Sequence, residues 1–202
     1  IMGEHGYLYF GIATQAVGAT PIRAGASGGG NHLGFDVDAV LDAVTPRTRI
    51  VFLDNPSNPL GTYLDSATLH RLRASLRDDV LLALDCAYGE YANAADFSCG
   101  DELVSASDNT VVLRTFSKVY GLAGLRIGWA HAPAAVAQTM LRVQRPGNVS
   151  RISLDAATAA LSEPELIADR IARNTQTREW FTSVVSEQLG LGVIPSQTNF
   201  VL

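Results

Sequence analysis

Short apolar runs alternate along this chain with segments of helical pattern, and this alternation limits the folds open to it. Residues 49–54, 80–85 and 110–116 are rich in apolar and β-branched side chains, and the first two have a continuous apolar middle. A strand that is apolar on both faces is covered on both, as in a parallel sheet between helices. The sequence therefore predicts an α/β fold, a three-layer sandwich with a mostly parallel sheet.

The segments between these runs carry the spacing and caps of helices. Asp36 and Asp65 are placed to cap helices that run to about Val44 and Leu76. Further helices are expected at 7–17, 133–143 and 154–161, a long amphipathic stretch at 163–189, and strands at 19–24 and 190–202. We place a domain boundary after Ser162, so that 1–162 form a large domain and 163–202 begin a small C-terminal α/β domain.

Composition and charge argue against several kinds of partner. The net charge of −5 disfavours nucleic acid and anionic membranes. No run approaches the length of a membrane span, and no secretory leader opens the sequence, so we expect a cytoplasmic protein. Cys86 and Cys99 fit neither a metal pair nor a disulfide framework, and the four histidines lack metal spacing, so we expect free thiols and no metal.

The chemistry of the chain concentrates where the third apolar run ends. Thr115 and Ser117 are two residues apart, so their hydroxyls point the same way in an extended chain. Lys118 follows directly, and Arg126 lies beyond a turn containing Gly121. Hydroxyls and a guanidinium suit a phosphate, and a lysine that can lose its proton suits a Schiff base with an aldehyde. A phosphate and an aldehyde on one molecule describe pyridoxal 5′-phosphate (PLP).

Two earlier segments offer side chains for the ring of such a cofactor. Asp85 ends the second apolar run, and ligands of open α/β sheets bind beyond the carboxyl ends of strands. A carboxylate there can pair with a protonated pyridine nitrogen and keep the ring an electron sink. Tyr88 and Asn58 could hydrogen-bond the phenolic oxygen of the ring. Taken separately, Asp85 could merely cap a turn and Asn58 merely shape one.

The segment Ser-Lys-x-x-Gly-Leu-Ala-Gly-Leu-Arg-x-Gly at 117–128 closely resembles the cofactor-lysine segment of the fold-type I PLP-dependent aminotransferases. The variant is that of the histidinol-phosphate aminotransferase branch, within the class II aminotransferases. The resemblance implies that Lys118 forms the Schiff base with PLP and that three residues hold its phosphate: Thr115, Ser117 and Arg126.

Two further motifs carry the same resemblance. Asn-Pro-Ser-Asn-Pro-Leu-Gly at 55–61 resembles the family's Asn-Pro-x-Asn-Pro-Thr-Gly, and Asp-Cys-Ala-Tyr at 85–88 its Asp-Glu-Ala-Tyr. They imply the ring contacts of Asn58, Asp85 and Tyr88. The chain departs from the pattern at Leu60 and Cys86, and neither change removes an assigned group. The family often places a ring-stacking aromatic residue where Tyr7 lies, although a core tyrosine is an equal alternative.

The implied activity is transamination between histidinol phosphate or an aromatic amino acid and 2-oxoglutarate, with Lys118 moving the proton. The resemblance also implies a homodimer that binds a small amino donor and a keto-acid acceptor. Ser196-Gln-Thr-Asn-Phe matches the family's Ser-x-x-Asn-Phe strand, after which an arginine binds the substrate carboxylate. That position lies beyond Leu202, because the chain corresponds to the middle of a typical member.

Three alternatives remain open at this point. A PLP-dependent amino-acid decarboxylase would share the fold, and a non-catalytic remnant of it would share the motifs. Ser27 lies in a Gly-x-Ser-x-Gly pattern that is typical of serine hydrolases. That motif requires a helix directly after the serine, whereas more glycines follow here.

Overall fold

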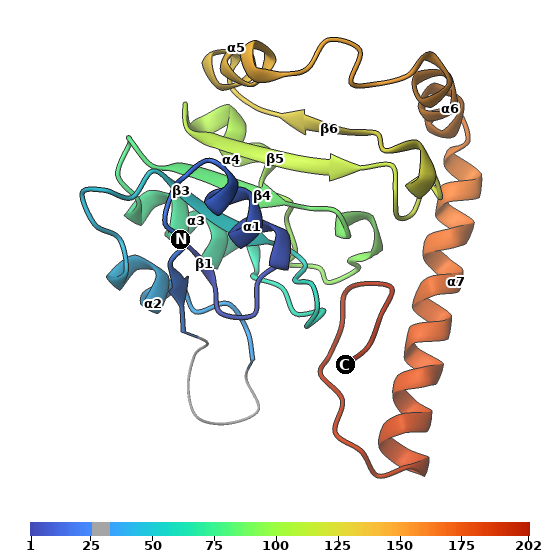
Figure 1. The fold of residues 1–202 in the computed structure, drawn as a ribbon. Coiled ribbons are helices and arrows are strands. Elements are labelled where there is room, and N and C mark those ends of the chain that lie inside the picture. The colour runs from blue at the N-terminus through green and yellow to red at the C-terminus, as the bar shows by residue number, and fades with distance from the viewer. Residues whose placement is uncertain (26–32) are drawn as a thin grey trace.

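The computed structural model describes residues 1–25 and 33–202. Within them, six strands form one sheet in the order β2-β1-β3-β4-β5-β6 (Figure 1). All neighbouring pairs are parallel except β5 and β6. The strands are β1 (Met2–Gly3), β2 (Arg23–Ala24), β3 (Ile50–Asp54), β4 (Leu81–Asp85), β5 (Thr110–Thr115) and β6 (Gly128–His131). The predicted α/β fold with a mostly parallel sheet is confirmed.

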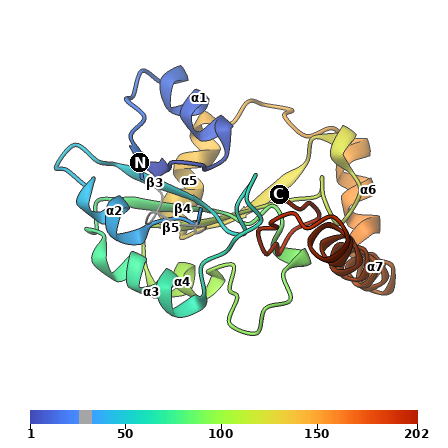
Figure 2. The ribbon, with the colours of Figure 1, turned by 90° about the horizontal axis from the view of Figure 1, so that it is seen from below.

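Three helices cover one face of the sheet: α2 (Val37–Asp42), α3 (Ser66–Ser75) and α4 (Asp101–Ala106). Figure 2 shows them together on one side, with α1 (Leu8–Ala16) on the other. Their apolar side chains and those of β3, β4 and β5 form the main core, which includes Val40, Leu53, Leu69, Leu72, Leu82, Leu84, Leu103 and Val112. The strand runs that looked apolar throughout are therefore buried under helices, as a parallel sheet requires.

The predicted caps start the helices. Asp36 accepts a hydrogen bond from the Ala39 backbone N–H at 2.9 Å, and Asp65 accepts one from Thr68 at 2.7 Å. Each carboxylate satisfies a backbone donor that has no partner within its own helix. The sequence did not predict α4, because six residues are too few to show a helical period; it follows Gly100, whose φ is +84°.

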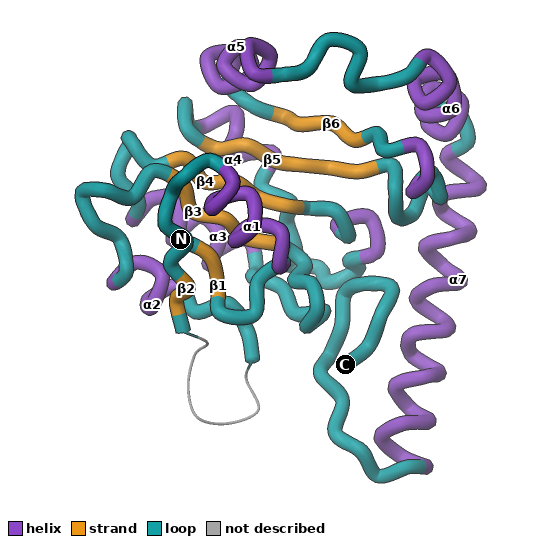
Figure 3. Tube along the Cα trace, in the orientation of Figure 1, coloured by secondary structure: helices purple, strands orange, loops and turns teal. Residues whose placement is uncertain are grey.

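The second half of the chain runs from β6 through α5 (Ala134–Val143) and α6 (Arg151–Leu161) into the long α7 (Pro164–Ser183). Figure 3 shows α7 beside the end of the sheet where β5 ends. Three short turns of helix complete the fold: η1 (Gly89–Tyr91), η2 (Ala123–Leu125) and the π-helical η3 (Val184–Gln188). The predicted helices are confirmed, and α6 begins three residues earlier than expected, after the cap Ser150.

Two predicted strands are wrong in whole or in part. Of residues 19–24 only β2 is extended in the sheet, and residues 190–202 form no strand. A strand needs a neighbouring backbone ladder. The C-terminal segment instead makes isolated bonds, from Gln197 N to Gly61 O at 2.8 Å and from Ile194 N to Leu202 O at 2.9 Å. Side chains of α7 take the Thr198 carbonyl, which accepts from Asn174 and Arg178 at 3.1 Å each.

Candidate active site

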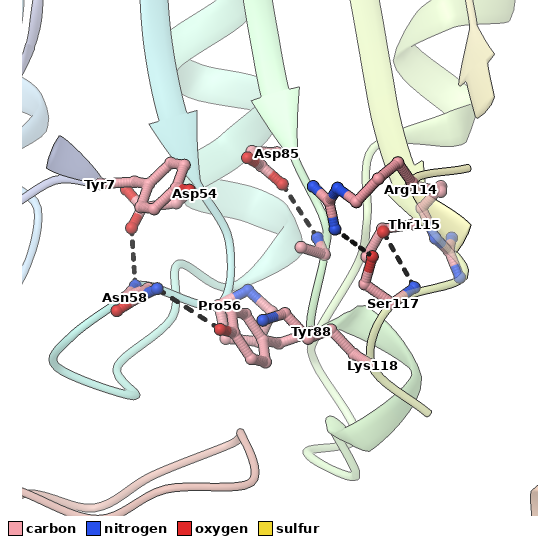
Figure 4. Close-up of a pocket in the computed structure, with 12 residues that line it drawn as sticks. Tyr7, Asp54, Pro56, Asn58, Asp85, Tyr88, Arg114, Thr115, Ser117 and Lys118 are labelled. Carbon is pink, nitrogen blue, oxygen red and sulfur yellow. Dashed lines mark hydrogen bonds between the residues drawn. The ribbon is translucent and has the colours of Figure 1, made fainter. Parts of the chain in front are cut away.

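A cavity of about 310 Å³ opens where β3, β4 and β5 end (Figure 4). Because these strands are parallel, their carboxyl ends meet at one edge of the sheet. The structure brings all eight residues singled out from the sequence to this cavity: Tyr7, Asn58, Asp85, Tyr88, Thr115, Ser117, Lys118 and Arg126. Asp54, Pro56, Ala87 and Arg114 line it as well.

One side of the cavity is a cluster of hydrogen-bond donors from the end of β5 and the turn that follows. Thr115 Oγ1 accepts a bond from the Ser117 backbone N–H at 3.0 Å. Arg126 Nη1 donates to Ser117 Oγ at 3.4 Å and to the Ala123 carbonyl at 2.8 Å. A long hydroxyl contact and the remaining guanidinium donors leave this cluster able to bind an anion with several oxygens.

The turn that returns Arg126 to this cluster needs unusual backbone. Arg126 itself has a φ of +48°, which is the left-handed region, and it is the only non-glycine residue with positive φ in the described part of the chain. Gly121 has a φ of +75°. At Gly128, a Cβ atom would lie 2.6 Å from the Arg114 carbonyl oxygen, so only glycine lets β6 approach β5 here. Strain held at a ligand-facing residue is a feature of functional sites.

Lys118 lies three residues after the end of β5 at Thr115, with its amine over a tyrosine ring. Its Nζ is 4.9 Å from the centroid of the Tyr88 ring. The Lys118 carbonyl accepts a bond from Gly121 N at 2.9 Å, and the next residue, Val119, is almost fully buried. Arg170 of α7 donates to the Val119 carbonyl at 3.0 Å. The backbone that carries the amine is therefore held on both sides.

Asp85 at the end of β4 is a half-buried carboxylate with few partners. Its Oδ1 accepts a bond from the Ala87 backbone N–H at 3.0 Å. Burial raises the pKa of Asp85 above its ordinary value, while the Ala87 N–H and the charge of Lys118 act in the opposite direction. A protonated ring nitrogen placed against Asp85 would favour its ionised form, so the site fits such a group.

Asn58 and Tyr88 face one another across the cavity (Figure 4). Asn58 Nδ2 donates to the Tyr88 hydroxyl at 3.4 Å, and the rings of Tyr88 and Phe200 form a T-shaped pair with centroids 5.1 Å apart. Tyr7 is 40% exposed and contacts Phe10 edge-on, so it is not a core tyrosine. Whether Tyr7 stacks on a ligand stays a prediction, as do the roles of the other residues.

Sequence reasoning missed Asp54 and Arg114. Asp54 carries the same signal as Asp85, an aspartate at the end of an apolar run, and the two are paired in register across β3 and β4. Arg114 could have been noticed as a charge inside an apolar strand. It makes a buried ion pair with Glu90 at 2.7 Å, and its guanidinium lies 5.3 Å from the centre of the Trp129 ring.

The competing motifs find little support. Ser27, the hydrolase candidate, lies outside the described residues. Cys86 and Cys99 are free, and the Cys86 thiol donates to the Cys99 carbonyl at 3.3 Å. Among residues 1–25 and 33–202 no group of three potential metal ligands comes together. In the same ranges, no helix combines the length and the apolar character that a bilayer crossing requires.

The sequence also matches a known protein family and individual curated proteins. The sequence model of aminotransferase class I and II matches residues 6–202, and the chain belongs to this family. It is 47% identical over 202 residues to the histidinol-phosphate aminotransferase of Paramagnetospirillum magneticum, covering all of this chain and 54% of that protein. The histidinol-phosphate aminotransferase of Rhodospirillum centenum gives the same identity and the same shares.

Solved structures agree with the sequence matches. The histidinol-phosphate aminotransferase of Sinorhizobium meliloti, in complex with pyridoxal 5′-phosphate, superposes with a TM-score of 0.90 at 29% identity, over 99% of this chain and 53% of that one. Aspartate aminotransferase from Thermus thermophilus shares the fold, with a TM-score of 0.84 at 22% identity over 99% of this chain and 53% of that one. The family and the branch that the sequence resembles are confirmed. The chain spans about half the length of the curated relatives it matches.

Proposed function

We propose that this protein is a PLP-dependent aminotransferase that moves an amino group between histidinol phosphate, or an aromatic amino acid, and 2-oxoglutarate. The observation that carries the proposal is that Lys118, the single lysine of the sequence, shares one cavity with Asp85 and with the Thr115, Ser117 and Arg126 cluster. When bound, PLP supplies an aldehyde that reacts with amines and a ring that accepts electrons from the substrate. The matched relatives named as histidinol-phosphate aminotransferases support the choice of amino donor.

Each group in the cavity has a task that its position favours. Thr115, Ser117 and Arg126 bind the phosphate through hydroxyl and guanidinium donors. Asp85 holds the proton on the ring nitrogen, and a carboxylate held by a single backbone N–H is free to do so. Asn58 and Tyr88 orient the phenolic oxygen of the ring, a role that fits their mutual contact.

Lys118 acts on the substrate in two ways. Its amine would leave the PLP aldehyde free for the incoming amine, and its Nζ would then take the proton from the substrate α-carbon and pass it to the cofactor. The Gly121 N–H bond to the Lys118 carbonyl and the burial of the next residue, Val119, hold the backbone that carries Nζ, which limits where the amine can reach. A lysine amine in contact with the Tyr88 ring also stays close to the cavity rather than in bulk solvent.

Borohydride reduction of the protein with PLP tests the proposal. Of the 202 residues, only the peptide that contains Lys118 should carry the reduced PLP. In a separate unreduced sample, the PLP absorbance should change when histidinol phosphate is added. Lys118→Arg is the matched control, since it keeps the charge and should remain unlabelled. Labelling at the N-terminal amine alone, or no labelling, would contradict the assignment of Lys118.

The alternative functions lack a specific observation of their own. L-threonine-O-3-phosphate decarboxylase from Porphyromonas gingivalis has a TM-score of 0.78 at 20% identity, and this likeness concerns the fold alone. A non-catalytic remnant has no need to keep all eight cavity residues together. Two measurements separate the three functions. An aminotransferase should convert PLP in the half-reaction with histidinol phosphate or phenylalanine, a decarboxylase should release CO₂ from an amino acid, and a non-catalytic remnant should do neither.

We also propose a homodimer, with the amino donor and keto acid as its small-molecule ligands. Exposed apolar side chains on the α1 side of the sheet, Leu8, Tyr9 and Ile12, support a further contact surface there. Sedimentation equilibrium of the full-length protein measures the oligomeric state. The division after Ser162 and the cytoplasmic location stay predictions.

A further inference from the structure

Asp54 is a buried carboxylate in the cavity that the proposed function does not use. It ends β3 beside Asp85 and is only 6% exposed. Its Oδ2 accepts a hydrogen bond of 2.6 Å from the backbone N–H of Asn58. The side chain of Asn58 in turn donates to the Tyr88 hydroxyl. Asp54 therefore bonds directly to one of the two residues proposed to contact the phenolic oxygen of PLP, and through Asn58 to the other.

The ionised carboxylate of Asp54 destabilises the folded protein. The pKa of Asp54 is raised to about 6, chiefly by burial and to a smaller extent by the negative charge of Asp85, against the lowering effect of the Asn58 N–H, the backbone N–H of Asp54 and the Ser57 hydroxyl. The described contacts of Asp54 include no cation. A buried, unpaired acid costs stability, and such groups gather at functional sites.

The other charged and titratable groups around the cavity come from every element that borders it. Asp85 ends the neighbouring strand, and Gly6 lies close to Asp54, since a Cβ at Gly6 would be 3.5 Å from Asp54 Oδ1. The remaining groups line the same cavity from the segment before α1, from the end of β4 and from β5 with its following turn: Tyr7, Tyr88, Arg114, Lys118 and Arg126.

We propose that Asp54 is a positioning residue for the cofactor site: its carboxylate fixes the backbone of Asn58 and thereby aims the Asn58 amide, with Tyr88, at the ring oxygen. This inference rests on the proposed function. Asn58 sits in a turn of the segment 55–61, where no regular ladder holds the backbone, and a 2.6 Å bond to a carboxylate is of the strong, charge-assisted kind. Ionised Asp54 should hold Asn58 more firmly than the protonated acid does.

The probe is pyridoxine 5′-phosphate, which has the ring and the phosphate but no aldehyde, so it binds without forming an imine with Lys118. Its affinity is measured by calorimetry on the cofactor-free full-length protein between pH 5 and pH 8. The variants are Asp54→Asn, which keeps an acceptor without a charge, and Asp54→Ala, which removes the acceptor. Asp36→Ala is the matched control, because it loses a similar backbone bond at the α2 cap, away from the cavity.

At pH 7.5 we expect Asp54→Asn to bind about three- to tenfold more weakly than wild type, and Asp54→Ala about tenfold or more weakly, as for loss of a charge-assisted bond. At pH 5 wild type and Asp54→Asn should converge. The phosphate of the probe also titrates near pH 6, but equally for both proteins, so their ratio isolates Asp54. Hydrogen exchange at the backbone N–H of Asn58 should be faster in Asp54→Ala and unchanged in Asp36→Ala.

Two results would overturn the inference alone: a wild-type to Asp54→Asn ratio that stays flat across pH, or Asn58 exchange that is the same in all variants. A wild-type protein that binds neither pyridoxine 5′-phosphate nor PLP would overturn the proposed function and this inference with it. Asp54→Asn keeps the size of the side chain, so the test stands even where Asp54→Ala does not fold.

Discussion

The amine of Lys118 lies over the ring of Tyr88, with Nζ 4.9 Å from the ring centroid. The two residues follow different strands, β5 and β4, and the Tyr88 ring also makes a T-shaped contact with Phe200. Tyr88 thus has two separable parts, a ring that contacts the amine and a hydroxyl that contacts Asn58.

Tyr88→Phe should keep the ring and lose only the hydroxyl. We expect PLP affinity to fall by about two- to tenfold, the loss of one hydrogen bond of roughly 0.5–1.5 kcal/mol, with little change in melting temperature. Tyr88→Ala should also lower stability, because Tyr88 is 7% exposed and packs on Phe200. Equal PLP affinities for wild type and Tyr88→Phe would place the ring oxygen of PLP elsewhere.

Asp85→Asn should leave PLP able to react with Lys118 but slow transamination strongly. An amide cannot stabilise a protonated ring nitrogen as a carboxylate does, so the ring accepts electrons less readily. Single-turnover loss of PLP absorbance after adding the amino donor is the measurement. Near-normal rates would mean that Asp85 is only a partner of the Ala87 N–H.

Arg126→Ala should weaken PLP binding more than it alters the chemistry. The guanidinium can give a phosphate two charge-assisted bonds of roughly 1.5–3 kcal/mol each, so affinity should fall by about one to a few orders of magnitude. Thr115 and Ser117 remain, so binding should not be abolished. PLP titration of the cofactor-free protein checks this, with Arg142→Ala on the exposed end of α5 as the control.

Asp54→Asn should stabilise the cofactor-free protein at neutral pH. The folded-state pKa of about 6 lies above the ordinary 3.8, so protonated Asp54 favours the folded state below pH 3.8 and that contribution is lost as pH rises through 6. The two values differ by 2.2 (about 6 minus 3.8), which corresponds to about 3 kcal/mol as an order of magnitude. Denaturant titrations at pH 4 and pH 8 should show the variant gaining only at the higher pH; an equal gain at both would show that Asp54 does not titrate.

Gly128→Ala should destabilise the junction of β5 and β6. Its Cβ would lie 2.6 Å from the Arg114 carbonyl oxygen, and backbone cannot move aside as a side chain can. We expect a loss of about 1–3 kcal/mol in the free energy of unfolding. Gly124→Ala, where no atom lies within 4 Å of the added methyl group, should be nearly neutral, and similar losses in both variants would contradict the close approach.

The sequence by itself determined the layers and the strand ends. Apolar runs at β3, β4 and β5, with the caps Asp36 and Asp65, are local signals, and they led directly to a parallel sheet with Asp85 and Lys118 at its edge. The motif residues were found for the same reason, since spacing along a strand or a turn survives in one dimension.

Only the tertiary structure decided which segments pair as strands and which side chains come into contact. The segment 190–202 has a strand-like sequence, but α7 and the loop at Gly61 take its backbone groups, so no ladder forms. Asp54 and Asp85 carry the same local signal, an aspartate at the end of an apolar run. Only the tertiary structure shows that Asp54 lies beside Asp85 in the register of β3 against β4 and bonds to Asn58. Burial and cross-strand distance depend on residues far apart in the chain, and no local pattern encodes them.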